Sequence, residues 1–151
     1  LEFRRVLFRS DMKDLELAKS HLLENNRNFV LVRDYEIIIE SSDGGIKPIF
    51  DTYTQNKESL KDASVADRVI GKAAAIFLIS GEIKQLYTDL ISDIAYALLE
   101  ENGIQVEYKE KVPMILNRTG DDLCPMEKLS SKSKDVDELI LNIEEFFNKI
   151  K

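Results

Sequence analysis

The sequence predicts a single α/β domain built on a mixed β-sheet, and two observations carry this prediction. Two short runs rich in β-branched and aromatic residues, 29–33 and 35–40, are separated only at Asp34, as in an antiparallel hairpin. A strand, a helix and a second strand follow in short succession over 83–108, which is typical of a right-handed parallel crossover. A hairpin and a parallel pair in one domain indicate a mixed sheet.

The segment 65–79 is predicted to form the central helix, buried against that sheet. Its few charged residues include Asp67 and Lys72, and it is too short and too charged at its start to cross a membrane. Ser64 followed by Asp67 resembles a capping box, which would begin the helix there. Gly71 inside a helix costs about 1 kcal/mol relative to alanine, so we expect a packing reason for it.

The remaining elements follow from periodicity and capping residues. Ser92 and Asp135 are predicted to cap the two helices that follow them. The run 41–45 ends in two glycines and is predicted to be a turn, although its amides can also face an anion. The segment 111–132 is predicted to be an irregular loop, the kind of segment that often carries function. Helices are predicted at 13–25, 46–53, 92–102 and 135–149, and strands at 83–88 and 104–108.

Composition restricts the classes of function. With 151 residues, of which 44% are hydrophobic, the chain can bury one core without a disulfide or a metal. The single cysteine and the absence of a long apolar run predict a cytoplasmic protein with no membrane segment, and no cofactor is implied. A net charge of −7 without a basic cluster argues against a nucleic-acid partner.

The first residues resemble the in-frame translation of a sequencing adapter. We therefore expect 1–11 to be a non-native leader and 12–151 to be the single domain, with Met12 as its natural start. Because the first ten residues contain three arginines and one glutamate, their removal changes the net charge from −7 to −9.

Two stretches resemble a known family. They are Ala63-Ser-Val-Ala-Asp-Arg-Val-Ile-Gly-Lys-Ala-Ala-Ala75, and Asn117-Arg-Thr-Gly together with Cys124-Pro-Met-Glu127. Both are similar to a small prokaryotic family called domain of unknown function 1893, and the similarity runs from about Met12 to the last helix. The resemblance implies a cytidine-deaminase-like fold, which is a three-layer α/β/α sandwich with a mixed sheet.

That fold suggests deamination, but the residues needed for it are missing. Zinc deaminases require three His or Cys ligands, a Glu in H-x-E and a P-C-x-x-C motif. The chain has one His and one Cys, and neither lies in the segments 64–67 and 91–94, where the predicted helices begin. We therefore expect no metal site and no zinc-dependent deaminase activity.

Three hypotheses remain open. In the first, a pocket inherited from the deaminase fold binds a small anionic or nucleotide-like ligand, and Cys124 lies on the lid over that pocket. The second is a metal-free enzyme in which Cys124 is the nucleophile, activated by Lys72 or by a helix N-terminus. The third is a structural or assembly module, since the resemblance implies that such domains can form homo-oligomers. The residues predicted to bind the ligand in the first hypothesis are Ser64, Asp67, Lys72, Asn117, Arg118 and Glu127.

Overall fold

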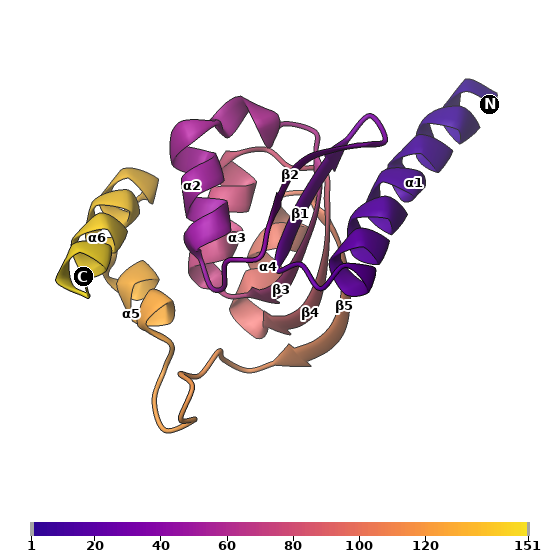
Figure 1. Cartoon of the computed structure of the whole chain (residues 1–151). Coiled ribbons are helices and arrows are strands. Elements are labelled where there is room, and N and C mark those ends of the chain that lie inside the picture. The colour runs from indigo at the N-terminus through magenta and orange to yellow at the C-terminus, as the bar shows by residue number, and fades with distance from the viewer. Residues whose placement is uncertain (1, 151) are drawn as a thin grey trace.

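A five-stranded mixed sheet organises the domain (Figure 1). The computed structural model describes residues 2–150, with side chains described from residue 13 onward. The strand order is β2-β1-β3-β4-β5. Strand β1 is antiparallel to both β2 and β3, whereas β3, β4 and β5 are parallel, so the predicted mixed sheet is confirmed. The strands are β1 (Phe29–Arg33), β2 (Glu36–Ser41), β3 (Ser64–Ile70), β4 (Gln85–Ser92) and β5 (Gln105–Val112).

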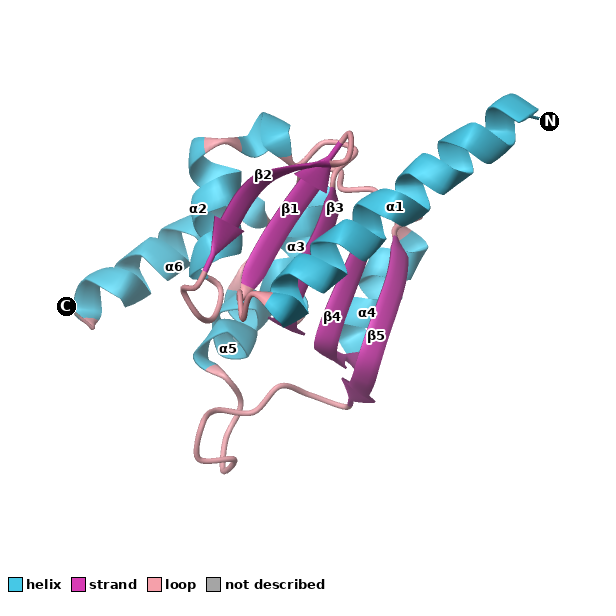
Figure 2. Cartoon of the chain, turned by 45° about the vertical axis from the view of Figure 1, so that its right-hand side comes forward, coloured by secondary structure: helices cyan, strands magenta, loops and turns pink. Residues whose placement is uncertain are grey.

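Helices lie on both faces of the sheet. Helix α1 crosses one face, and the other helices lie on the opposite side (Figure 2). The helix begins at Glu2, so it continues through most of the predicted leader, whose non-native origin stays a prediction. The helices are α1 (Glu2–Glu24), α2 (Lys47–Gln55), the 3₁₀ turn η1 (Lys57–Ser59), α3 (Lys72–Ser80), α4 (Asp93–Glu101), α5 (Pro125–Lys132) and α6 (Val136–Lys149).

Each face of the sheet has its own apolar cluster. Alternate residues of β1 contribute to opposite clusters, because successive side chains of a strand point to opposite faces. The larger cluster joins Phe29 and Leu31 to helices α2, α3, α4 and α6. The smaller one is formed by Leu15, Ala18, Leu22, Val30, Val32, Ala66 and Tyr87, with α1 as its cover.

The predicted central helix is wrong in its first half. Residues Ser64–Ile70 form β3, the middle strand of the sheet, and only Lys72–Ser80 form a helix. Strand β3 is largely buried, its sequence Ser-Val-Ala-Asp-Arg-Val-Ile does not alternate between apolar and polar residues, and only Gly71 and Lys72 separate it from the apolar run 73–79 of helix α3, so periodicity alone does not distinguish the strand from the helix. The capping box predicted from Ser64 and Asp67 is therefore wrong too. Helix α3 is preceded instead by Gly71 in an extended conformation.

The hairpin turn is tight and connects to α1. Asp34 and Tyr35 have φ values of 54° and 57°, as both central residues of a type I′ turn require. The backbone N–H of Tyr35 donates a 2.7 Å hydrogen bond to the carboxylate of Asp14 on α1. This bond ties the hairpin to the helix that covers the sheet.

Both predicted helix caps are confirmed. The Ser92 hydroxyl accepts a hydrogen bond from the Ala95 N–H at 3.3 Å, and the Asp135 carboxylate accepts one from the Glu138 N–H at 2.9 Å.

Replacing Ser92 with alanine is expected to lower the free energy of unfolding by about 1 kcal/mol, because a buried N–H loses its acceptor. Urea unfolding followed by circular dichroism measures the loss. Ser131→Ala is the matched control, because that hydroxyl bonds to a carbonyl within its own helix. Equal stability of Ser92→Ala and the wild type would contradict the cap's contribution.

The segment predicted as an irregular loop, 111–132, is more ordered than expected. Strand β5 continues to Val112, and Pro125 begins helix α5, where a proline needs no N–H partner. Only 113–124 remains a loop, and it contains one antiparallel bridge between Leu116 and Leu123. Within the described part of the chain, no helix is long and apolar enough to cross a membrane.

Candidate functional site

A groove of about 530 Å³ lies at the carboxyl ends of the parallel strands. Ligands bind at this edge in open α/β sheets, because the loops and helix N-termini gather there. Most of the wall is apolar, and the loop after β5 supplies its outer side. The apolar lining is Val69, Leu90, Val112, Met114, Ile115 and Leu116; the polar lining is Asn28, Asp67, Arg68 and Arg118; Gly44 and Gly45 complete it.

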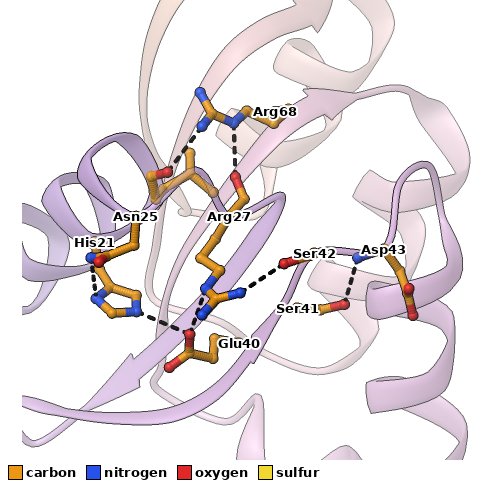
Figure 3. Close-up of polar contacts among 9 residues, drawn as sticks. His21, Asn25, Arg27, Glu40, Ser41, Ser42, Asp43 and Arg68 are labelled. Atoms are coloured by element: carbon orange, nitrogen blue, oxygen red, sulfur yellow. Dashed lines mark hydrogen bonds and ion pairs between the residues drawn. The ribbon is translucent and has the colours of Figure 1, made fainter.

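A network of polar contacts holds the glycine loop that lines the groove (Figure 3). Arg27 forms an ion pair with Glu40 at 2.7 Å and donates to the Ser42 hydroxyl at 2.7 Å. His21 bonds to the same Glu40 carboxylate at 3.1 Å, and this bond lowers the pKa of Glu40. The network ties α1 and the end of β2 to Ser42, which precedes the groove-lining residues Gly44 and Gly45 by two and three positions.

Asp67 is the buried polar group of the groove. It lies in β3 between Phe29 of β1 and Thr88 of β4, and only 4% of its surface is exposed. Its Oδ1 accepts the Val69 N–H at 3.2 Å, whereas its Oδ2 has no hydrogen-bond partner within the described residues. Burial raises the pKa of Asp67 well above its usual value, against the opposing effects of backbone hydrogen bonds and of Arg68.

Arg68 follows Asp67 in the chain but does not pair with it. Its guanidinium donates to Asp89 at 2.9 Å, and to the backbone carbonyls of Leu22 and Arg27 at 2.9 Å each. The Tyr87 hydroxyl donates to the same Asp89 at 2.7 Å, and burial together with this bond raises the pKa of Tyr87 to about 12. The guanidinium of Arg68 therefore binds groups on the α1 face of the sheet and does not form an ion pair with Asp67.

Arg118 lies on the rim of the groove, in the exposed loop after β5. Within residues 13–150, neither a carboxylate nor a carbonyl pairs with its guanidinium. The turn that carries it is shaped by Asn117, whose side-chain oxygen accepts the Gly120 N–H at 2.9 Å. The groove is therefore lined by the buried carboxyl of Asp67 and, at its exposed rim, by a guanidinium that has no partner among residues 13–150.

A smaller pocket of about 90 Å³ adjoins the groove and shares Gly45, Val69 and Ile115 with it. Cys124 and Glu127 line this pocket. Glu127 is 9% exposed, and its Oε1 accepts the backbone N–H of Lys72 at 2.8 Å. A carboxylate from α5 thus occupies the N-terminus of α3, where unpaired N–H groups favour a negative charge.

Gly71 makes room for this carboxylate. A Cβ atom at this position would lie 2.2 Å from Glu127 Oε1, far inside the contact distance. The packing reason expected for Gly71 is therefore the approach of Glu127, at the boundary between β3 and α3 instead of inside a helix.

The structure brings together four of the predicted site residues, in two adjoining hollows. Asp67 and Arg118 line the groove, and Cys124 and Glu127 line the small pocket. The side chains of Lys72, Ser64 and Asn117 line neither hollow. Ser64 lies at the other end of β3, where its hydroxyl accepts a 2.7 Å bond from Gln85. Lys72 takes part through its backbone N–H, and the role of Cys124 as a nucleophile stays a prediction.

Several groove residues were not predicted as part of a site. Asn28, Leu90 and Val112 come together only because β1, β4 and β5 have their ends at one edge of the sheet. They could have been identified if 64–70 had been recognised as a strand, because that strand lies between β1 and β4 and brings their ends together. Within the described residues, no three His, Cys, Asp or Glu side chains are grouped as metal ligands.

Comparisons with known proteins agree on one family. The model of the family described as "Domain of unknown function (DUF1893)" matches residues 17–147. A crystal structure of a DUF1893 family protein from Thermotoga maritima is 30% identical in sequence, with a TM-score of 0.77. The similarity covers 87% of this chain and 88% of that one. No match was found among curated proteins. The family match covers most of the chain, which therefore belongs to the DUF1893 family.

Proposed function

We propose that this protein is a small-molecule-binding domain with a cytidine-deaminase-like fold, and that it binds a small anionic or nucleotide-like ligand in the groove. The strand order, the hairpin beside three parallel strands and the helices on both faces support this three-layer α/β/α arrangement.

The helix starts argue for binding without zinc-dependent deamination. In this arrangement the two helices that follow β3 and β4 take the places of the H-x-E and P-C-x-x-C helices. The N-cap of the first is Gly71, followed by Lys72-Ala73-Ala74 and seven residues later than the cap predicted at Ser64; the N-cap of the second is Ser92, followed by Asp93-Ile94-Ala95. Neither segment contains His or Cys, so the residues present do not fit a deaminase zinc site.

One observation carries the ligand-binding proposal: the carboxyl of Asp67 is buried at the groove, and one of its oxygens has no hydrogen-bond partner in the part of the chain that the structure describes. Buried polar groups in folded proteins are nearly always hydrogen-bonded, so an unpaired one beside a hollow of ligand size marks a binding site. Arg118 supplies the anion contact, because a guanidinium binds phosphate and carboxylate with two parallel hydrogen bonds.

Thermal-shift screening with nucleosides, nucleotides and small carboxylates tests the proposal. A ligand present at 100 times its Kd stabilises the fold by about 2.7 kcal/mol. For a chain of this size, that corresponds to a rise in Tm of roughly 5–10 °C. Arg118→Ala is expected to weaken binding of the anionic compounds about tenfold or more, because one charge-assisted contact is lost.

Lys134→Ala is the matched control. It removes the same charge as Arg118→Ala, but Lys134 is exposed and lines neither hollow. It is expected to leave the thermal shift unchanged. The proposal is wrong if no compound raises the Tm, or if Arg118→Ala and Lys134→Ala respond alike.

A further inference from the structure

We infer that Asp67 acts as an uncharged hydrogen-bond donor that binds a carbonyl or ring-nitrogen acceptor on the ligand. This inference rests on the proposed function and specifies the ligand class. The ligand is a small organic anion whose acidic group contacts Arg118 and whose flat, largely apolar body carries a hydrogen-bond acceptor.

The two oxygens of Asp67 differ in their surroundings. Oδ1 already accepts the Val69 N–H at 3.2 Å, so it is the carbonyl-like oxygen of a protonated carboxyl group. The proton then belongs on Oδ2, the buried oxygen for which residues 13–150 provide no partner. A hydroxyl at this position donates one hydrogen bond, and the missing partner is an acceptor.

The surroundings favour the protonated form. Burial is the largest influence on Asp67, and it disfavours the carboxylate. The neighbouring Arg68 is the cation that could stabilise a carboxylate, but it is held by Asp89 and by two backbone carbonyls. Phe29 and Thr88, the residues beside Asp67 on the adjacent strands, carry no charge.

The walls of the groove define the rest of the ligand. Val69, Leu90, Ile115 and Leu116 offer apolar surface for a flat ring, and Arg118 offers a cation at the rim. A volume of about 530 Å³ accommodates a ring with an acidic substituent. The acidic group of the ligand belongs at the rim, because Arg118 supplies the cation there.

Calorimetric titration of the whole protein with matched probes tests the inference. Nicotinate and benzoate share a shape and a carboxylate and differ by one ring nitrogen, which is the acceptor. Uridine and adenosine 5′-monophosphates extend the set to larger anions with ring acceptors. We expect nicotinate to bind at least tenfold more tightly than benzoate, or the nucleotides to bind where benzoate does not.

Two substitutions at Asp67 distinguish the contribution of its hydrogen-bond donor to binding from the contribution of its side-chain shape. Asp67→Asn keeps an acceptor for Val69 N–H and an N–H donor in place of Oδ2, so affinity for the acceptor-bearing probe is expected to stay within about threefold. Asp67→Leu has a similar volume but no donor and is expected to lose tenfold or more. Circular dichroism and Tm confirm that both variants fold.

The outcomes distinguish the two proposals. If no probe binds the wild type, the ligand-binding function fails and this inference fails with it. If a probe binds and Asp67→Leu binds it as tightly as the wild type, or if Asp67→Asn loses as much affinity as Asp67→Leu, the neutral-donor role is wrong while ligand binding stands.

Discussion

Replacing Asp67 with asparagine is expected to make the ligand-free protein more stable, by about 1–3 kcal/mol at neutral pH. The carboxyl is buried, and burial disfavours the ionised form that the same group adopts in the unfolded chain at neutral pH, which costs the folded protein free energy. Asparagine has the same shape, carries no ionisable group and keeps the bond from the Val69 N–H. A residue that lowers stability and lies at a groove is typical of functional sites.

The gain should depend on pH, with a definite sign. Burial raises the pKa of Asp67 above its value of about 3.9 in an unfolded chain, and the smaller influences of Arg68 and Asp89 oppose each other. Between these two pKa values the folded protein binds one more proton than the unfolded chain. The wild type therefore loses stability as the pH rises through this window, whereas Asp67→Asn does not.

Urea unfolding of both proteins from pH 4 to pH 8 measures this difference. The stability gap is expected to be smallest near pH 4 and to widen with pH until Asp67 ionises in the folded state. Asp62→Asn is the control, because this substitution removes the same charge from an exposed position. A gap that stays constant across the range, or an Asp67→Asn protein less stable than the wild type, would refute the buried-carboxyl account.

Gly71 and Glu127 are expected to behave as one unit. Glu127→Ala removes the acceptor of the Lys72 N–H at the start of α3 and is expected to cost about 1–3 kcal/mol. Gly71→Ala should have a similar cost, because the new Cβ would lie 2.2 Å from the carboxylate oxygen and displace it. Once Glu127 is truncated, that collision is gone, so the double variant should be about as stable as Glu127→Ala alone.

A double-mutant cycle in urea quantifies this coupling. Glu127→Gln is the conservative comparison, since it keeps an oxygen acceptor but loses the charge that the helix N-terminus favours, and a smaller loss is expected. Additive costs for Gly71→Ala and Glu127→Ala would show that the two residues act separately.

Local signals identified the elements that depend on neighbours in the sequence. The hairpin at Asp34, the crossover through α4 and the caps at Ser92 and Asp135 are each specified within a few residues. Strand β3 could not be identified in this way, because its apolar and polar residues do not alternate and the apolar run of helix α3 follows it after only two residues. Gly71 was visible in the sequence, but only the packing of Glu127 shows that it marks the end of a strand.

Some residues of the site were predicted correctly, but for reasons that differ from those the structure shows. Asp67 was chosen as part of a helix N-terminus, yet it lies at the groove because β3 is a strand. Arg118 was chosen for its loop and does lie on the groove rim. Glu127 was predicted to contact a ligand, whereas in the structure it contacts the N-terminus of α3, a pairing 55 residues apart that no local pattern specifies.

That long separation affects the order in which the molecule can be completed during synthesis. Glu127 lies 55 positions after Lys72, so β3 and α3 are synthesised well before it, and the N–H of Lys72 has no acceptor from α5 until Glu127 has been translated. The small pocket beside the groove, which Glu127 lines, is therefore finished late, after the central strands have been made. A nascent chain that stops short of α5 contains the whole sheet but not the carboxylate that accepts the Lys72 N–H at the start of α3.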